Sequence, residues 1–448
     1  MSTQRLALID CNNFYVSCEQ AFNPALRNRP VVVLSNNDGC VVSRSAEAKQ
    51  AQIPMGVPFF QIRQQLARIN GVALSSNYVL YADMSQRAMR LIREQIPDQE
   101  IYSIDECFVD LSEFSADQAL VQAFRLRQRL LQCLSLPVSV GIGNSKTQAK
   151  LASAIAKDRA KNIAKGGDRA DASGVCDLSG SFSGSHLSAE RQAEIARQPV
   201  DSVWGIGRRT AQSLAAAGVT TVGDLLQKPT SWVRKRYSIN LLQTVEELKG
   251  QSQLTFQSTW APRQQIIASR SFGQAVYAYA DLAEAIATFV ARAGERLRAD
   301  RSLASTIRIY FRAKDPSDAG VPYTDEIALP LPQATDDTRL LIRQALEGLE
   351  QIYIPGLKYK KAGVILSGIS SADIRQPSLL GLYPEAEGPS RTMQLMDRVN
   401  QRYGRDTLRV ASLGTNKDAP WHMSCSRRSR RYTTMLDELP VFSAYGMS

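Results

Sequence analysis

Two apolar segments of this sequence end in acidic residues, and their positions restrict the fold more than any other feature. Residues 5–10 (RLALID) have the pattern of a short buried strand that ends at Asp10. Much later, the segment IYSIDECFVDLS alternates across two predicted strands, which turn near Asp105 and Glu106. If these strands are neighbours in one sheet, the three carboxylates lie together.

A cluster of three carboxylates requires cations. Two carboxylates about 4 Å apart repel each other by roughly 4 kcal/mol at an effective dielectric constant of about 20, a cost that divalent metal ions remove. Two metal ions bridged by carboxylates stabilise both the attacking and the leaving oxygen of an in-line phosphoryl transfer. The spacing alone leaves a second interpretation open, in which Asp10 caps a helix and the Asp105–Glu106 pair is a solvated turn.

The composition excludes several other kinds of chemistry. His186 and His422 are the only histidines, which leaves little material for a Ser-His-Asp triad or a histidine metal site. The seven cysteines form no CxxC pair, which argues against zinc and suits a reducing compartment. No apolar run approaches the roughly 18 residues of a membrane span, and the start of the chain has no signal-peptide pattern. We therefore expect a cytoplasmic protein of three or four small domains, with no membrane partner.

The formal charge of +11 is unevenly distributed. Residues 1–120 carry 10 basic and 13 acidic side chains, whereas residues 121–275 carry 21 and 10. An acidic region followed by a basic one fits a metal site beside a polyanion-binding surface. Charge alone also fits a merely soluble basic protein.

The hydrophobic pattern divides the chain into three folded parts. Strands and helices alternate up to about residue 160, with a helix predicted for FYVSCEQAF directly after the Asp10 strand. A Gly-, Ser- and Asp-rich stretch predicts a linker over 166–186, and residues 188–250 have a helical pattern. The elements predicted after it follow the βαββαβ order of a ferredoxin-like unit, at 267–276, 281–300, 304–313, 325–330, 335–350 and 359–368.

Two lysines have positions that suit a phosphate. In VGIGNSKTQAK, Gly141 and Gly143 permit a close turn, and Lys146 lies in the first turn of the next predicted helix, where backbone N–H groups attract anions. Lys49 is the only lysine before Lys146 and could add a second positive charge. Either lysine alone is equally typical of an ordinary helix start or protein surface.

Two further motifs suit nucleic acid and nucleotide. The segment VWGIG, with Gly205 and Gly207 followed by Arg208 and Arg209, resembles a helix-hairpin-helix that exposes backbone N–H groups and arginines to a phosphate. A plain helix turn is the alternative. Phe14 and Tyr15, one helical turn after Asp10, could present an aromatic face to a sugar, although core positions would otherwise be the ordinary interpretation.

Taken together, these segments resemble the Y-family DNA polymerases, and within that family the UmuC type, the catalytic subunits of DNA polymerase V. The resemblance runs from about residue 5 to 435 and is carried by DCNNFYVSCE, SNNDGCVVSRSAEAK, SSNYVLYADMS, YSIDECFVDL, VGIGNSKTQAKLAS, VWGIGRR, SRSFG and QRYGRDTLRVAS. It implies an α+β multidomain protein with the right-hand polymerase fold. The implied parts are a palm (1–20 and 78–165), small fingers (21–77), the linker 166–186, a helical thumb with a helix-hairpin-helix (187–250), a ferredoxin-like little finger (262–370) and a C-terminal tail (371–448).

The resemblance also implies roles for individual residues. Asp10, Asp105, Glu106 and the backbone carbonyl of Cys11 match the ligands of two Mg²⁺ ions, for which Mn²⁺ is an alternative. Tyr15 matches the steric gate against ribonucleotides, and the other expected nucleotide contacts are Phe14, Ser43, Lys49 and Lys146. Arg270, in SRSFG, is expected on the first little-finger strand beside DNA phosphate, together with the thumb residues Gly205, Gly207, Arg208 and Arg209. Asn12 and Ala46 depart from the pattern of many relatives, and Asn12 is not counted as a ligand.

The implied activity is error-prone translesion synthesis in the SOS response, with primer-template DNA and dNTPs as substrates and no proofreading exonuclease. Small side chains in the fingers would check the nascent base pair loosely. The implied partners are a UmuD-type dimer, a recombinase filament and a sliding clamp, for which QPSLL offers Gln376, Leu379 and Leu380. A catalytically silent DNA-binding scaffold, a metal-dependent nuclease or phosphatase, and a polymerase IV type remain as alternatives.

Overall fold

The computed structural model describes residues 4–163, 174–180, 186–257, 262–314, 321–374, 390–415 and 419–439. These residues separate into two compact units. The first comprises 1–34, 40–260 and 427–448, and the second comprises 35–39 and 261–426. Within the described part of the chain, no helix is both long and apolar enough to cross a membrane.

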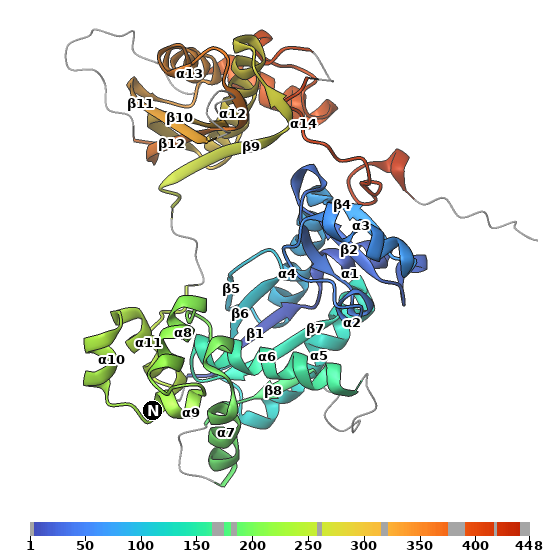
Figure 1. The fold of residues 1–448 in the computed structure, drawn as a ribbon, viewed down its shortest axis with the longest axis vertical. Helices are drawn as coiled ribbons and strands as arrows, with labels where there is room; N and C mark the ends of the chain where they lie inside the picture. Colours follow the sequence, from blue (N-terminus) through green and yellow to red (C-terminus); the bar gives the residue numbers. More distant parts are fainter. Residues whose placement is uncertain are drawn as a thin grey trace, which may run out of the picture. The chain divides into compact units, whose positions relative to one another are not determined.

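The first unit is built on a central sheet of five described strands, in the order β5-β6-β1-β7-β8. The strands are β5 (Gln99–Ile101), β6 (Glu106–Asp110), β1 (Leu6–Cys11), β7 (Val138–Gly143) and β8 (Val175–Asp177). Side chains of β1 alternate between two faces. Ala7 and Ile9 join a core with α1 (Phe14–Phe22), α4 (Tyr78–Gln95) and α5 (Ala116–Leu134), whereas Leu8 faces α6 (Lys146–Ile163). Both faces of the sheet are therefore covered, as Figure 1 shows.

The predicted fingers are a small separate layer within the same unit. Strands β3 (Val41–Arg44), β2 (Val31–Leu34) and β4 (Val72–Ser75) form a sheet in that order, accompanied by α2 (Ala46–Gln50) and α3 (Phe59–Arg68). Their own core contains Val32, Leu34 and Ile53. The small size of this core leaves the fingers dependent on packing against the larger sheet.

Short helices form the predicted thumb. They are α7 (His186–Arg197), α8 (Arg208–Ala216), α9 (Val222–Leu226), α10 (Thr230–Arg236) and α11 (Ile239–Leu248). Their core includes Leu151 and Ile155 of α6, so α6 is shared between the central sheet and the thumb. The expected linker over 166–186 is wrong for residues 174–180, because β8 pairs in parallel with β7 and buries Val175 and Cys176. Three strand residues among glycines and serines were too few to give a periodic signal.

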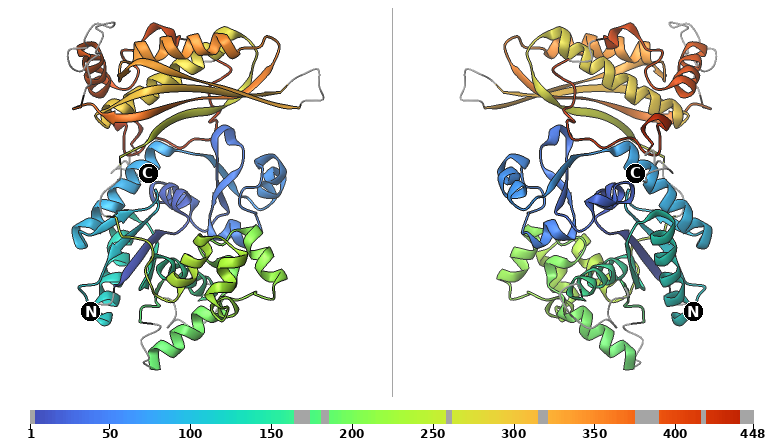
Figure 2. Two further views of the ribbon diagram at one scale, coloured as in Figure 1. Left: turned by 90° about the vertical axis from the view of Figure 1, so that its left-hand side faces the viewer. Right: turned by 90° about the vertical axis from the view of Figure 1, so that its right-hand side faces the viewer.

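The second unit confirms the predicted βαββαβ order. Its elements are β9 (Gln265–Val276), α12 (Tyr279–Ala299), β10 (Ser302–Lys314), β11 (Pro322–Thr335), α13 (Thr338–Ile352) and β12 (Lys358–Ser371), and the sheet order is β11-β10-β12-β9. Each βαβ segment is split by one strand, because β12 lies between β9 and β10 and β10 lies between β11 and β12. Both helices cover the same face of this sheet (Figure 2). Helix α14 (Arg391–Tyr403) follows in the tail.

Candidate active site

Backbone pairing brings the three predicted carboxyl residues together. Strands β1 and β6 are antiparallel neighbours at the centre of the sheet, and Asp10 lies directly opposite Glu106 in their register. The backbone N–H of Cys11 donates to the carbonyl of Asp105 at 2.8 Å, which joins the turn before β6 to the end of β1. Glu106 is therefore the first residue of the strand ladder, whereas Asp105 lies in the turn that precedes it.

Two lysines from α6 neutralise these carboxylates. The Nζ atom of Lys157 lies 2.5 Å from Oδ2 of Asp10, and the Nζ atom of Lys150 lies 2.8 Å from Oε1 of Glu106. The third carboxylate, Asp105, accepts a hydrogen bond of 2.6 Å from the hydroxyl of Ser103. Sequence reasoning missed both lysines. The available signal was their spacing from Lys146 on a helix that follows a buried strand.

Burial perturbs the acid at the end of β1. The pKa of Asp10 is raised from 3.8 to about 6, because desolvation by burial, together with the neighbouring charges of Glu106 and Asp105, outweighs the opposing effect of Lys157. A raised carboxyl pKa beside two other carboxylates indicates a site that gains from a cation.

Carboxylate oxygens are the donors that Mg²⁺ prefers, so these residues fit that ion chemically. Among the described residues, however, no three His, Cys, Asp or Glu side chains are arranged as ligands of a metal ion. In this structure the ammonium groups of Lys150 and Lys157 take the cation positions instead. The side chains would have to turn away from the lysines to share a metal.

Lys146 does not lie among these groups. Its Nζ atom donates to both carboxylate oxygens of Glu100 at 2.7 Å and to the carbonyl of Thr255 at 2.8 Å, and its side chain is buried. The start of α6 is likewise occupied, because the carboxylate of Glu247 accepts a hydrogen bond from the N–H of Thr147 at 3.0 Å. The expected phosphate contact at Lys146 is thus replaced by an internal ion pair.

The two glycines before α6 serve helix packing. A Cβ atom at Gly141 would lie 2.1 Å from the backbone nitrogen of Ser153, and one at Gly143 would lie 2.5 Å from Cβ of Gln148. The absence of side chains lets α6 approach the sheet closely. This packing places Lys150 and Lys157 within reach of the carboxylates.

An aromatic stack lies behind the same strand end. Tyr15 is half-buried, and its ring stacks on Tyr81 of α4 with centroids 4.5 Å apart and planes 14° apart. Tyr78 meets Tyr15 edge-on at 6.0 Å. Phe14 is only 3% exposed and belongs to the core, so it has no face for a ligand and the expectation of a nucleotide contact there is not supported.

The predicted contacts from the fingers converge on the turn after Asp10. Lys49 of α2 donates from its ammonium group to Oδ1 of Asn13. Ser43 is buried, and its hydroxyl donates to the carbonyl of Asn13 at 3.4 Å. Asn13 adopts φ 51° at the start of α1, which turns the chain from β1 into the helix. Lys49 and Asp10 are therefore brought near the same turn.

The predicted DNA contacts lie on exposed backbone and arginines. In the first unit, Gly205 has φ 90° and Gly207 caps α8, where Arg208 and Arg209 are exposed. In the second unit, Arg270 is exposed on β9. A groove of about 570 Å³ near it is lined by the cations of Arg312, Lys314, Lys358, Lys360 and Lys361. The predicted clamp peptide, with Gln376, Leu379 and Leu380, lies outside the described residues.

The overall fold is that of the Y-family DNA polymerases. A chimera of Dbh and Dpo4 from that family matches with a TM-score of 0.61 at 17% identity, covering 82% of this chain and 99% of the chimera. A Dbh ternary complex matches with a TM-score of 0.53 at 17% identity, covering 81% and 98%. The predicted right-hand α+β class is confirmed.

Sequence comparison identifies the group within that fold. The model of the impB/mucB/samB family matches residues 9–154, and the model of that family's C-terminal domain matches residues 263–379. Protein UmuC of Salmonella typhimurium is 38% identical over 435 residues, covering 97% of this chain and 99% of its own, and protein MucB of Escherichia coli is 37% identical with the same coverage. A DNA polymerase IV of Moorella thermoacetica is 26% identical over 431 residues, covering 91% and 95%. The chain belongs to the impB/mucB/samB family, and it is of the UmuC type rather than the polymerase IV type.

Proposed function

We propose that this chain adds dNTPs to a DNA primer opposite damaged template at the site formed by Asp10, Asp105 and Glu106. The observation that carries the proposal is the register of β1 and β6, which fixes Asp10 opposite Glu106 beside the lysines of α6. Membership of the UmuC-type family makes the chain an error-prone translesion DNA polymerase. What is proposed is how its residues perform that reaction.

Asp10, Asp105, Glu106 and the backbone carbonyl of Cys11 would hold two Mg²⁺ ions, or Mn²⁺ in their place. When bound, such ions activate the primer hydroxyl and stabilise the charge on the transferred phosphate. The protein contributes rigid oxygen donors on adjacent strands, and hard oxygen donors suit these cations. Lys150 and Lys157 neutralise the carboxylates until then.

Lys49 and Lys157 are the proposed triphosphate contacts. Lys157 takes the role that the sequence suggested for Lys146. Both ammonium groups lie near the end of β1, at Asn13 and Asp10 respectively. Lys157 is partly exposed, whereas the charge of Lys146 is satisfied by Glu100. Ser43 contributes a small side chain beside Asn13 rather than a charge.

Tyr15 is the proposed sugar-facing residue. Its half-exposed ring is held by Tyr81 at the end of β1, next to the carboxyl cluster, which suits exclusion of a 2′ hydroxyl. Arg208, Arg209 and the backbone N–H groups near Gly205 and Gly207 would hold DNA phosphate without reading sequence. In the second unit, Arg270 and the arginine and lysine side chains of the nearby groove of about 570 Å³ offer the same kind of contact.

The remaining features extend the sequence expectations. We expect no removal of mismatched primer ends, activity in the cytoplasm, and dependence on a UmuD-type dimer, a recombinase filament and a sliding clamp. Extension across an abasic site, with and without those partners, measures the dependence. Incubation of a mismatched primer with the chain alone tests for exonuclease activity.

The decisive experiment removes two carboxylates. The double change Asp105→Ala and Glu106→Ala should abolish primer extension with Mg²⁺ and dNTPs while DNA binding persists. Asp110→Asn is the matched control, because Asp110 lies on the same strand and its carboxylate accepts a hydrogen bond from the N–H of Ser112. Extension by the double variant would refute the metal assignment.

Two other functions predict different results in the same assays. A silent scaffold would bind primer-template and show no extension even with its partners present. A nuclease or phosphatase would shorten DNA or release phosphate in the absence of dNTPs. Lys49 and Lys157, the proposed triphosphate contacts, and the aromatic ring of Tyr15 favour synthesis over hydrolysis.

A further inference from the structure

Residues 390–441 match a family model described as a domain of unknown function, and the structure divides this segment into two parts. Residues up to 426 belong to the second unit, whereas residues from 427 onward belong to the first. The two parts therefore pack in different hydrophobic cores. Each can be described by its own contacts.

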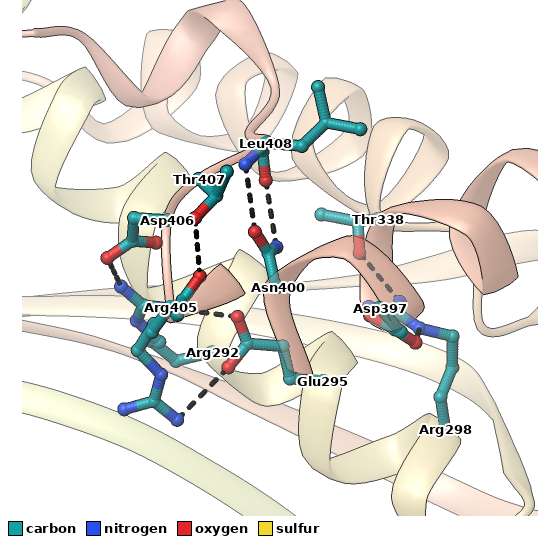
Figure 3. A network of polar contacts seen from close by, with 11 residues as sticks. Arg292, Glu295, Arg298, Thr338, Asp397, Asn400, Arg405, Asp406, Thr407 and Leu408 are labelled. Carbon is teal, nitrogen blue, oxygen red and sulfur yellow. Dashed lines mark hydrogen bonds and ion pairs between the residues drawn. The ribbon is translucent and has the colours of Figure 1, made fainter. Parts of the chain in front are cut away.

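The first part is built into the helical face of the second unit. Arg298 of α12 makes two ion-pair contacts with Asp397 of α14, at 2.6 and 2.9 Å, as Figure 3 shows. Nearer the start of α12, Arg292 contacts Asp406 at 2.5 Å. Trp421 is buried in the core of that unit, against Phe289. This part of the tail is an integral layer of its unit.

The second part is held by the first unit through backbone and side-chain bonds. The N–H of Ser75 donates to the carbonyl of Arg427 at 3.1 Å, and the N–H of Arg427 donates to the hydroxyl of Ser75 at 3.0 Å. The buried amide of Asn77 donates to the hydroxyl of Ser429 at 2.9 Å and to the carbonyl of Arg430 at 3.0 Å. Asn77 also caps α4, so the tail is attached at the start of that helix.

An aromatic stack fixes the next residues. Tyr432 lies parallel to Phe22 of α1, with ring centroids 5.0 Å apart and planes 5° apart. Tyr432 also packs against the core that contains β1 and α4. The tail therefore contacts the two helices that carry Tyr15 and Tyr81.

A buried carboxylate links the tail to those tyrosines. Glu19 of α1 is 1% exposed, and its Oε1 atom accepts hydrogen bonds from the hydroxyl of Tyr81 at 2.7 Å and from that of Ser429 at 3.0 Å. Burial raises the pKa of Glu19, and the two hydroxyl donors oppose the shift. Within the described part of the chain, Glu19 forms no ion pair. The two hydroxyls thus carry much of its stabilisation.

Tyr81 transmits this arrangement to the site. Its ring is fully buried, its hydroxyl is fixed by Glu19, and its face stacks on Tyr15 at 4.5 Å. We propose that Ser429 of the tail, acting through Glu19 and Tyr81, positions the ring of Tyr15 and so contributes to discrimination between deoxyribonucleotides and ribonucleotides. Ser429, Glu19 and Tyr81 are positioning residues. The inference rests on the proposed role of Tyr15 at the sugar.

The test compares full-length variants in single-nucleotide primer extension. The quantity measured is the ratio of kcat/KM for a dNTP to kcat/KM for the matching rNTP. Ser429→Ala removes one donor to Glu19, and Tyr81→Phe removes the other donor but keeps the stacked ring. Each should lower the ratio about five- to tenfold, mainly by raising kcat/KM for the rNTP, because each loses a hydrogen bond to a buried carboxylate.

Ser426→Ala is the matched control, since Ser426 is an exposed serine of the same tail and should leave the ratio unchanged. Tyr15→Ala is the positive control and should lower the ratio most. If Tyr15→Ala lowers the ratio and neither Ser429→Ala nor Tyr81→Phe does, the positioning inference is overturned and the role of Tyr15 stands. If Tyr15→Ala leaves the ratio unchanged, the proposed sugar contact itself is wrong, and the inference falls with it.

A purely structural role gives a third pattern. Equal losses of kcat/KM for both nucleotides, accompanied by a lower melting temperature, would also overturn the inference. Because Ser429→Ala could disturb folding, Tyr81→Phe provides the second variant, as it changes no packing volume beyond one hydroxyl. The melting temperature of each variant is compared with that of the unaltered chain.

Discussion

Replacing Asp10 by asparagine should stabilise the metal-free protein while it abolishes activity. Desolvation of Asp10 raises its pKa from 3.8 to about 6, so the folded state binds the proton more tightly than the unfolded state does. Stability is therefore lost as the pH rises through this range. By linkage, the cost of ionising Asp10 grows from about 0.5 kcal/mol at pH 4 to about 3 kcal/mol at pH 8.

Asp10→Asn removes this cost because the amide does not ionise. Urea unfolding in EDTA, followed by circular dichroism, should give a stability gain at pH 8 that becomes small near pH 4. Asp83→Asn is the matched control for the loss of one charge. Asp83 pairs with Arg87 on the surface of α4, so its replacement should change the unfolding free energy by less than about 0.5 kcal/mol. A loss of stability for Asp10→Asn at pH 8, or a gain independent of pH, would refute the reasoning.

Three further predictions concern packing and charge. Lys146→Met should lower the unfolding free energy by about 3 kcal/mol, because it leaves the largely buried Glu100 unpaired, and it should change the KM for dNTPs little. Lys157→Ala should raise the KM for dNTPs about tenfold in steady-state extension. A raised KM for Lys146→Met and an unchanged KM for Lys157→Ala would restore Lys146 as the triphosphate contact. Gly141→Ala should reduce soluble folded protein or lower the unfolding free energy by more than about 3 kcal/mol, because the new Cβ would meet the backbone of α6. Arg298→Ala should make α14 susceptible to limited proteolysis, because it removes the paired contact with Asp397, and an unchanged digestion pattern would contradict that role.

The fold was largely predictable because its elements have strong periodic patterns. Helix α1 has the bounds predicted from FYVSCEQAF, and the βαββαβ order of the second unit follows the predicted segments within a few residues. The main failure was β8, whose three residues lie in a Gly- and Ser-rich stretch. Its strand conformation comes from pairing with β7, a tertiary contact that no local pattern contains.

The site was predictable where backbone register determines it and not where side-chain partners do. Asp10 and Glu106 meet because two buried strands are neighbours, and buried strands are recognisable in sequence. The partner of Lys146 was not predictable, because a lysine at a helix start has the same pattern whether it meets a phosphate or an internal carboxylate. Its partner, Glu100, comes from β5, and nothing near Lys146 in the chain indicates that contact.

The C-terminal segment shows why sequence units and packing units must be kept apart in designing experiments. One family model spans 390–441, yet Trp421 completes the core of the second unit and Tyr432 packs against the core of the first. A deletion of the whole segment would expose apolar surface in both units and remove the hydroxyl of Ser429 from Glu19 at the same time. Loss of activity in such a deletion could not be assigned to any one of these effects. Single changes at Ser429 and Tyr81 leave both cores intact, so only they separate the positioning of Tyr15 from the stability of the chain.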